Sequence, residues 1–118
     1  MKENRVNYVE KPWGNETWIT VTQHYALKLI NLKKNSRTSL QYHNLKEEHI
    51  FVLSGKLSIE EDGENGSLKA VTYEPGEIAH YPALSKHRLS ALEDSTFIEV
   101  STPFMDDVVR VEDDYKRK

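Results

Sequence analysis

Residues 39–49 read SLQYHNLKEEH, and this stretch carries three potential metal ligands in a pattern that suits a pair of strands. Gln41 and His43 lie two residues apart, so their side chains project from the same face of an extended chain. Glu48 opens the apolar segment that follows, where it shares a face with every second residue. A turn between His43 and Glu48 would bring the three side chains together. Because amide, imidazole and carboxylate groups all bind borderline divalent metals, these residues predict a metal site.

A fourth potential ligand lies downstream, in residues 76–87, which read GEIAHYPALSKH. An extended segment runs to Pro82, a short turn follows, and His87 begins the returning segment. In a small barrel, neighbouring strands would place His87 beside the first three side chains. We therefore expect one metal to be bound by Gln41, His43, Glu48 and His87.

Other titratable side chains near this set have a structural interpretation as well. Glu47 is the alternative carboxylate, but Glu48 is the one that shares a face with the apolar positions of its segment. His49 projects opposite to Glu48, so we expect it to be structural. His80 lies near the predicted site along the sequence, and the pattern does not decide between a structural and a functional role for it.

The rest of the chain consists of short strand-like segments separated by turns. These segments have four to eight residues, are rich in Val, Ile, Thr, Tyr and Phe, and no window shows a convincing helical stripe. The pattern predicts an all-β sandwich or closed barrel, with one domain over residues 1–118 and polar tails at about 1–7 and 112–118. The tip, residues 116–118, is expected to be solvated. The expected strands are Trp18–Thr22, Tyr25–Leu32, His49–Leu53, Lys56–Glu60, Leu68–Tyr73, Ile78–Pro82, His87–Leu92, Thr96–Ser101 and Val108–Val111.

Composition and charge exclude several classes of site and of binding partner. The 118 residues include no cysteine, which excludes disulfide scaffolds, thiolate metal sites and cysteine nucleophiles. The formal net charge is −3, whereas a protein that binds nucleic acid or an anionic membrane needs a basic surface. The first residues contain no apolar signal segment, and no apolar run reaches membrane-spanning length. From these missing signals we expect a cytoplasmic protein with neither nucleic-acid nor membrane partners.

Two spacings resemble the paired motifs of the cupin superfamily: His43-x4-Glu48-x6-Gly55 and Gly76-x5-Pro82-x4-His87. The resemblance narrows to the C-terminal isomerase domain of type II mannose-6-phosphate isomerases, and it covers roughly residues 8–117. It implies a single-domain cupin fold, which is a double-stranded β-helix or jelly-roll barrel. The segments that carry the narrower resemblance are KPWG (11–14), LKLI (27–30), SLQYHNLKEEH (39–49), Pro82–Leu89, IEV (98–100), DDVVR (106–110) and EDDY (112–115).

The resemblance also implies a function. It suggests a metal-dependent aldose–ketose isomerase that acts on a sugar phosphate, most specifically on mannose 6-phosphate and fructose 6-phosphate. The cations at matching positions are Lys46 and Arg88, expected in catalysis, and Lys28 and Arg110, expected in substrate binding. Glu99 lies in an otherwise apolar segment, where a carboxylate is either salt-bridged or a catalytic general base. The expected cofactor is zinc, with Mn, Co, Ni or Fe as alternatives, because ligand type alone rarely decides the metal. A homodimer is a further expectation.

Two other functions stay open because the sequence departs from the family pattern. Lys46 and Leu29 stand where the family has arginine, which favours a non-catalytic metal-binding cupin that acts as a sugar-binding or regulatory module. An iron dioxygenase is a less favoured alternative because Gln41 replaces a histidine. The sequence carries no glycine-rich nucleotide loop, so we expect no nucleotidyl transfer.

Overall fold

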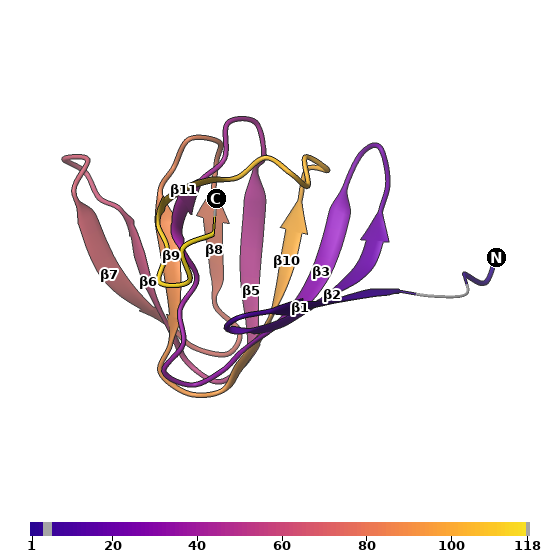
Figure 1. Cartoon of the computed structure of the whole chain (residues 1–118), viewed down its shortest axis with the longest axis horizontal. Helices are drawn as coiled ribbons and strands as arrows, with labels where there is room; N and C mark the ends of the chain where they lie inside the picture. The colour runs from indigo at the N-terminus through magenta and orange to yellow at the C-terminus, as the bar shows by residue number, and fades with distance from the viewer. Residues whose placement is uncertain (4–5, 118) are drawn as a thin grey trace.

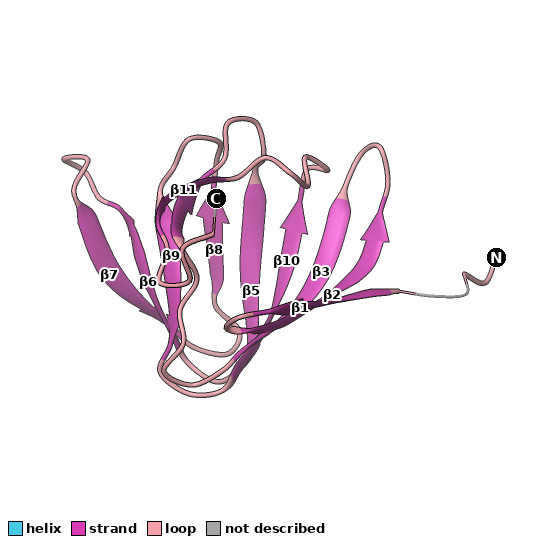
Figure 2. Cartoon of the chain, in the orientation of Figure 1, coloured by secondary structure: helices cyan, strands magenta, loops and turns pink. Residues whose placement is uncertain are grey.

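The computed structural model describes residues 1–3 and 6–117, and this part of the chain folds entirely into strands, turns and loops (Figures 1 and 2). It has no helix, as the sequence predicts. The first strands are β1 (Asn7–Lys11), β2 (Gly14–Val21), β3 (Ala26–Leu32), β4 (Leu40–Tyr42), β5 (Glu48–Ser54) and β6 (Leu57–Asp62). The remaining strands are β7 (Leu68–Tyr73), β8 (Ile78–Tyr81), β9 (His87–Ala91), β10 (Ser95–Ser101) and β11 (Val109–Glu112).

The strands form two antiparallel sheets that enclose one core. The first sheet has the order β1-β2-β3-β10-β5-β8, and the second has the order β11-β4-β9-β6-β7. Strands that are distant in sequence lie side by side, as in the pairing of β10 with both β3 and β5. This arrangement is the double-stranded β-helix that the resemblance implies.

The side chains that face the barrel interior change from charged to apolar along the barrel. On β3 the inward residues run from Lys28 to Ile30 and Leu32, and all three are buried. On the neighbouring strand, Glu99 pairs with Lys28, whereas Phe97 pairs with Ile30. Because the same register places polar residues at one level and apolar residues at the next, one end of the barrel is a packed hydrophobic core and the other is lined with charge.

The structure corrects several expected boundaries. β1 was not predicted, because its sequence NYVEK has little apolar character and the strand lies at a sheet edge, where only one partner is needed. β2 begins at Gly14 rather than Trp18. β4 contains Gln41 and has only three residues, too short to give a sequence signal.

The polar C-terminal tail is bound to the barrel at residues 112–114. Arg88 binds the side chain and the carbonyl oxygen of Glu112, both at 3.3 Å. Arg37 binds the Asp114 carboxylate through two nitrogens, at 2.6 and 2.8 Å. These contacts hold residues 112–114 against the second sheet. Residue 118 of the expected tail lies outside the described residues.

Within the part of the chain that the structure describes, no helix has the length and apolar character needed to cross a membrane.

Replacement of Gly55 by alanine should destabilise the fold far more than the same change at Gly66. Both residues have a left-handed backbone, with φ of 86° and 71°, so each alanine should cost about 1 kcal/mol in backbone strain. At Gly55 an added Cβ would lie 2.4 Å from the carbonyl oxygen of Asp94, whereas at Gly66 nothing lies within 4 Å. We expect Gly55→Ala to lose about 2 kcal/mol more than Gly66→Ala in urea unfolding. Equal losses would show that the close contact has no energetic effect.

Candidate metal centre and its cavity

Three buried side chains converge at the polar end of the barrel. His43 follows β4, Glu48 begins β5 and His87 begins β9. Glu48 Oε1 lies 2.8 Å from His87 Nε2 and 3.3 Å from His43 Nε2. One ligand atom from each residue lies within 4.8 Å of the others, which is a spacing that one metal ion can bridge.

The turn between His43 and Glu48 is held by Asp107, from the segment before β11. The Asp107 carboxylate accepts hydrogen bonds from the backbone N–H groups of Asn44, Leu45 and Lys46, at 3.0, 2.7 and 2.9 Å. Although burial raises the pKa of Asp107, these three hydrogen bonds lower it to a net value below the usual range. The charged carboxylate thus fixes the loop that joins two of the candidate ligands.

Both histidines are oriented by backbone carbonyl groups. His43 Nδ1 contacts the carbonyl oxygen of Asp107, and His87 Nδ1 lies 3.2 Å from that of Ser85. A carbonyl oxygen only accepts, so each Nδ1 must be the donor. Each Nε2 then faces Glu48, where it donates to the carboxylate when it carries a proton and offers its lone pair to a metal ion when it does not. This is the arrangement by which proteins prepare histidine to bind a metal.

This arrangement fits a divalent cation. His43 Nε2 and Glu48 Oε1 are buried and have no hydrogen-bond partner among the described residues. A buried polar atom without a partner costs about 1–3 kcal/mol. A cation bound by His43, Glu48 and His87 would satisfy both atoms, because each presents an electron pair to the same point.

The ring of His87 is also fixed by stacking on an aromatic neighbour. The Tyr81 ring stacks on it with 4.5 Å between centroids and 11° between planes. Tyr81 in turn donates a 2.9 Å hydrogen bond to Glu61, which also accepts a 2.9 Å bond from Tyr73. Burial and the charge of Glu61 raise the pKa of Tyr81, so its hydroxyl remains a donor. Tyr81 is therefore a positioning residue for His87.

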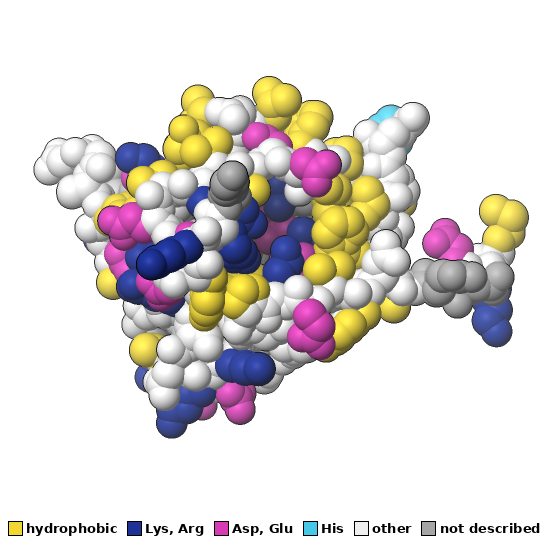
Figure 3. Space-filling model, viewed as in Figure 1, with side chains coloured by type: hydrophobic (Ala, Val, Ile, Leu, Met, Phe, Trp, Pro, Cys, Tyr) yellow, Lys and Arg dark blue, Asp and Glu magenta, His cyan; other side chains and the backbone are white. Residues whose placement is uncertain are grey.

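The three candidate ligands line a cavity of about 580 Å³, within the range of small-molecule sites. Figure 3 shows it as a hollow bordered by Lys and Arg side chains, with acidic atoms at depth. Its cationic lining residues are Lys11, Lys28, Lys46, Arg110 and Arg117, and its carboxylates are Glu16, Glu48, Glu99 and Asp106.

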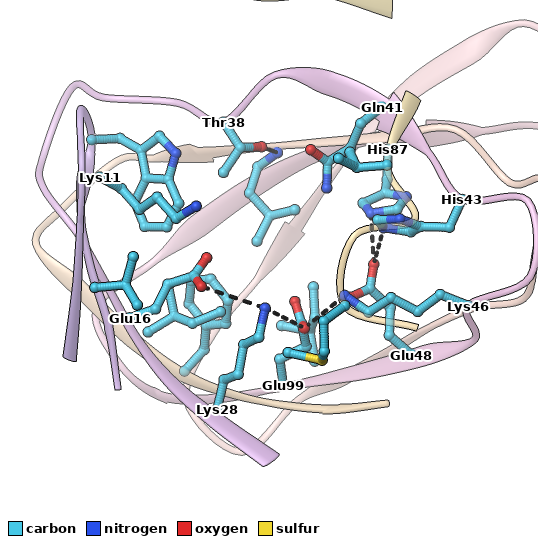
Figure 4. Close-up of a pocket in the computed structure, with 18 of the residues that line it drawn as sticks. Lys11, Glu16, Lys28, Thr38, Gln41, His43, Lys46, Glu48, His87 and Glu99 are labelled. Carbon is cyan, nitrogen blue, oxygen red and sulfur yellow. Dashed lines mark hydrogen bonds and ion pairs between the residues drawn. The ribbon is translucent and has the colours of Figure 1, made fainter. Parts of the chain in front are cut away.

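Opposite charges alternate along the cavity wall (Figure 4). Lys28 Nζ lies 3.4 Å from Glu16 and 3.8 Å from Glu99. Lys46 Nζ lies 3.0 Å from the same oxygen of Glu99 and 3.6 Å from Glu48. The two lysines are thus neutralised by three carboxylates, and the row ends at the candidate metal ligands.

These contacts shift the pKa values in different directions. Burial raises the pKa of Glu99, and the charge of Glu48 raises it further, against the opposing effect of Lys46 and Lys28. Burial would also raise the pKa of Glu48, but its interactions with His43 and His87 lower it well below the usual range. Burial would lower the pKa of Lys46, but the charges of Glu99 and Glu48 raise it overall. Lys46 therefore remains a protonated hydrogen-bond donor. Of the two carboxylates, Glu99 binds a proton more readily than Glu48.

The structure places most of the residues predicted from sequence around this cavity. Gln41 pairs with His87 across β4 and β9 and lines the cavity, where its Oε1 accepts a 2.7 Å hydrogen bond from Ser39. Its role as a fourth ligand stays a prediction. Lys28, Lys46, Glu99 and Arg110 line the cavity as well.

Arg88 is the exception and requires a correction. It follows the inward-facing His87 on β9, so its side chain points to the outer face of the second sheet. There Arg88 Nε donates a 3.0 Å hydrogen bond to the carbonyl oxygen of Thr38, and the rest of the guanidinium binds Glu112. These contacts give Arg88 a structural role, outside the cavity, in place of the expected catalytic one.

The outward histidine pair is likewise separate from the cavity. His49 and His80 stack with 4.3 Å between ring centroids, and His80 Nε2 lies 2.6 Å from Glu47. Glu47 therefore binds His80 on the surface. Of the two neighbouring glutamates, only Glu48 points into the barrel.

Four charged lining residues were not predicted from the sequence: Lys11, Glu16, Asp106 and Arg117. Lys11 and Glu16 come from β1 and β2, where no strand or an incomplete one was expected. Arg117 was assigned to a solvated tail, but its guanidinium binds Asp113 at 2.8 and 3.2 Å and lines the cavity. The match of EDDY to a family motif was the one available signal that the tail matters.

The double-stranded β-helix with a buried His, Glu and His cluster inside it defines the chain as a cupin. The chain belongs to the mannose-6-phosphate isomerase C-terminal family, whose model matches residues 2–113. It is 31% identical over 117 residues to the alginate biosynthesis protein AlgA of Pseudomonas aeruginosa, covering 92% of this chain and 23% of that protein. The xanthan biosynthesis protein XanB of Xanthomonas campestris pv. campestris is 30% identical over 114 residues, with the same coverage. The chain therefore spans about a quarter of the length of these curated relatives.

Solved structures with little sequence identity share the fold. KdgF from Halomonas sp. superposes with a TM-score of 0.75 at 19% identity, covering 85% of this chain and 88% of that one. Oxalate decarboxylase from Bacillus subtilis, in its structure at pH 4.6, gives a TM-score of 0.79 at 17% identity, covering 90% of this chain and 30% of that one. These likenesses establish the cupin architecture.

Removal of a candidate ligand should abolish tight metal binding. We expect His87→Ala and Glu48→Gln each to weaken zinc binding by more than about 100-fold, since even the loss of a group behind a ligand costs 10–100-fold. His49→Ala is the matched control, because His49 is next to Glu48 but projects from the opposite face of β5. Isothermal titration calorimetry measures all three. Zinc binding by His87→Ala as tight as that of the parent would contradict the site.

The tail contact at Asp113 should make stability depend on acid pH. Hydrogen bonds from Arg117 lower the pKa of Asp113 from 3.8 to about 2. Because the folded pKa is below the unfolded one, the stabilisation is complete above about pH 4 and disappears as the pH falls through 2. We expect Asp113→Asn to cost about 1 kcal/mol at pH 7, after allowance for solvent screening, and to cost only a small part of that at pH 2. Urea unfolding at several pH values measures the difference, and a constant difference would contradict this role.

Proposed function

We propose that the chain is a metal-dependent sugar-phosphate isomerase that interconverts mannose 6-phosphate and fructose 6-phosphate. Membership of the mannose-6-phosphate isomerase C-terminal family supports the substrate. The observation that carries the proposal is the placement of the Lys46–Glu99 pair directly beside the His43, Glu48 and His87 cluster in one cavity. This placement brings a candidate metal site, a base and a hydrogen-bond donor within reach of one small substrate.

His43, Glu48 and His87 would hold the metal, with Gln41 as a fourth ligand. When bound, the metal supplies a Lewis acid for the two substrate oxygens between which the double bond moves. Two histidines, one carboxylate and an amide suit zinc, while Mn, Co, Ni and Fe remain alternatives. Mn(II) centres are described for the Bacillus subtilis oxalate decarboxylase, which shares this fold at 18% identity and a TM-score of 0.75.

Proton transfer falls to Glu99. Isomerisation requires a base that removes the proton from C2 of the aldose and returns it to C1, while the hydroxyl proton passes from O2 to O1. Glu48 is occupied by the two histidines, and Glu16 lies on the far side of Lys28. Glu99 is buried next to Lys46, which also contacts Glu48, and burial raises its pKa, so we assign the base to Glu99. Lys46 Nζ, at 3.0 Å from Glu99, keeps this carboxylate in place and presents N–H groups to the developing negative charge on the substrate.

The substrate phosphate is assigned to the cations of the C-terminal segment and β1. Lys28 is held between two carboxylates of the cavity, which makes it a poor partner for the phosphate, and Lys46 is assigned to the reacting atoms beside Glu99. Arg110, Arg117 and Lys11 line the same cavity. A guanidinium has five N–H donors, so Arg117 can bind Asp113 and still donate to a phosphate.

A second candidate function is a sugar-phosphate-binding module without turnover. The observation that favours it is Lys46, a single ammonium in place of the family's arginine, with both carboxylates of its surroundings already bound to it. Leu29 no longer supports this alternative, because it lies on the outward face of β3 and does not line the cavity.

An exchange experiment distinguishes the two functions. In labelled water with added metal, the parent should exchange hydrogen at C2 of mannose 6-phosphate, and a chelator should stop the exchange. His87→Ala should lower the rate by more than about 10²-fold, the loss typical of one missing contact to a developing oxyanion. The same assay without oxygen should give the same rate, whereas a requirement for oxygen would indicate the dioxygenase alternative. A parent that binds metal but exchanges no sugar phosphate would support the binding module.

Arg117→Ala should raise the KM for mannose 6-phosphate by about tenfold or more, with a smaller effect on kcat, because the phosphate is bound equally in the ground and transition states. Lys116→Ala is the matched control, since Lys116 is exposed and does not line the cavity. Steady-state kinetics on both variants measure the effect. An unchanged KM in Arg117→Ala would remove Arg117 from the phosphate site.

A further inference from the structure

The cavity contains a buried carboxylate that neither the candidate metal centre nor the proposed proton transfer uses. Glu16 is 8% exposed and lines the cavity from β2, on the far side of Lys28 from Glu99. Its charge is balanced by Lys28, since a buried charge without a partner would be far more costly. The role of its second oxygen is open.

Two donors hold one oxygen of this carboxylate. The Trp18 indole N–H donates to Glu16 Oε1 at 2.8 Å, and Lys28 Nζ lies 3.4 Å from the same oxygen. Lys28 Nζ also lies 4.9 Å from the centroid of the Trp18 ring, where a cation is attracted to the aromatic face. Each of the three side chains thus contacts the other two, and together they fix the direction of the carboxylate.

The other oxygen, Oε2, is open to the cavity. It accepts no hydrogen bond from the described residues, and it is not one of their fully enclosed polar atoms that lack a partner. In Figure 4 one oxygen of Glu16 is joined to Lys28, and the other points away from that lysine. Glu16 Oε2 is therefore a fixed acceptor that a molecule inside the cavity can reach.

Building on the proposed function, we propose that Glu16 Oε2 accepts a hydrogen bond from a sugar hydroxyl group on a carbon between the reacting end and the phosphate. This contact makes Glu16 a specificity-determining residue. It selects a phosphorylated chain that carries hydroxyl groups over other phosphate esters of similar length.

The strand order of the first sheet supports this position for Glu16. From the candidate ligands outward, the inward charged residues are Glu48 on β5, Glu99 on β10, Lys28 on β3, Glu16 on β2 and Lys11 on β1. The reacting carbons C1 and C2 are assigned to the end with Glu48 and Glu99. The phosphate is assigned to Lys11 and the arginines of the C-terminal segment. Glu16 therefore lies beside the intervening carbons, which carry hydroxyl groups.

A carboxylate oxygen suits a hydroxyl group better than it suits the phosphate. It only accepts hydrogen bonds, so it binds an O–H donor, and its negative charge repels an anion. A site built to bind a hydroxyl group also rejects an analogue without that group, because the buried oxygen then stays unpaired. Because Trp18 and Lys28 already fix Glu16, little side-chain freedom is lost when the sugar binds.

Glu16→Gln tests the contact with little change of shape. Trp18 and Lys28 are both donors, so they should hold the amide oxygen and turn the NH₂ group toward the cavity. The ligand is mannitol 1-phosphate, the reduction product of mannose 6-phosphate, which keeps the hydroxyl groups but has no carbonyl group to react. Isothermal titration calorimetry on zinc-loaded protein should show binding weakened about five- to tenfold, the difference between a charged and a neutral hydrogen bond.

Inorganic phosphate should respond in the opposite direction. It has no carbon chain with hydroxyl groups, and the variant removes a negative charge from the cavity, so its affinity should stay unchanged or rise. Glu10→Gln is the matched control, because Glu10 is exposed on the neighbouring strand and does not line the cavity. It should alter neither affinity. An unchanged affinity for zinc shows that each variant is folded.

The parent protein allows a second test that needs no substitution. At least one of the 3-deoxy, 4-deoxy and 5-deoxy forms of mannitol 1-phosphate, numbered as in mannose 6-phosphate, should bind the parent about tenfold more weakly or worse. The same form should lose no further affinity in Glu16→Gln, because the contact is already absent.

The outcomes separate this contact from the proposed function. Binding of mannitol 1-phosphate that depends on Glu16, without exchange of hydrogen at C2 of mannose 6-phosphate, would support the contact and contradict turnover alone. Exchange by the parent, with equally tight binding of mannitol 1-phosphate by Glu16→Gln, would overturn the contact alone. Equal weakening of mannitol 1-phosphate and inorganic phosphate would also overturn it, since Glu16 would then only shape the cavity. A parent that binds neither ligand would overturn both proposals.

Discussion

Asp107 supports the candidate metal centre through both its carboxylate and its backbone carbonyl group. The carboxylate accepts the N–H groups of residues 44–46, and the carbonyl oxygen accepts His43 Nδ1. One residue therefore shapes the turn between His43 and Glu48 and also sets the direction of the first histidine. The same residue leads into β11 and the segment that supplies Arg110 and Arg117 to the cavity. Asp107 thus links the turn between two candidate ligands to the C-terminal segment of the cavity wall.

The barrel interior has an apolar level that stabilises the fold and an adjacent charged level that forms the candidate site. Phe97, Ile30 and Val52 fill one level of the interior, and Glu99, Lys28 and Glu48 occupy the adjacent one. Charges this deep are tolerated because each carboxylate has an ammonium or imidazole neighbour, and isolated buried charges would be far more costly. The apolar level beneath keeps their positions rigid, which a site with several ligands requires.

Local spacing predicted the all-β class and the convergence of the candidate ligands. The double-stranded β-helix and the cavity cations Lys28, Lys46 and Arg110 were expected from the family resemblance. Gln41 and His43 share a face through the two-residue period of a strand, and the return at Pro82 places His87 next to them. The same period shows why Arg88 faces away, although its place in a family motif suggested otherwise. Lys11, Glu16 and Arg117 could not be predicted in this way, since their positions depend on an edge strand and on a tail that folds back over long sequence distances. Register between distant strands is a tertiary property, and a single sequence contains little direct signal for it.

Both tryptophans of the chain, Trp13 and Trp18, line the cavity. The Trp18 indole donates a 2.8 Å hydrogen bond to Glu16, and Lys28 Nζ lies 4.9 Å from its ring centroid. The intrinsic tryptophan fluorescence of this protein therefore originates entirely from the walls of its cavity. Emission intensity and wavelength thus report on the contents of the cavity without any attached label, and a paramagnetic ion placed there acts as a quencher within reach of every indole in the molecule.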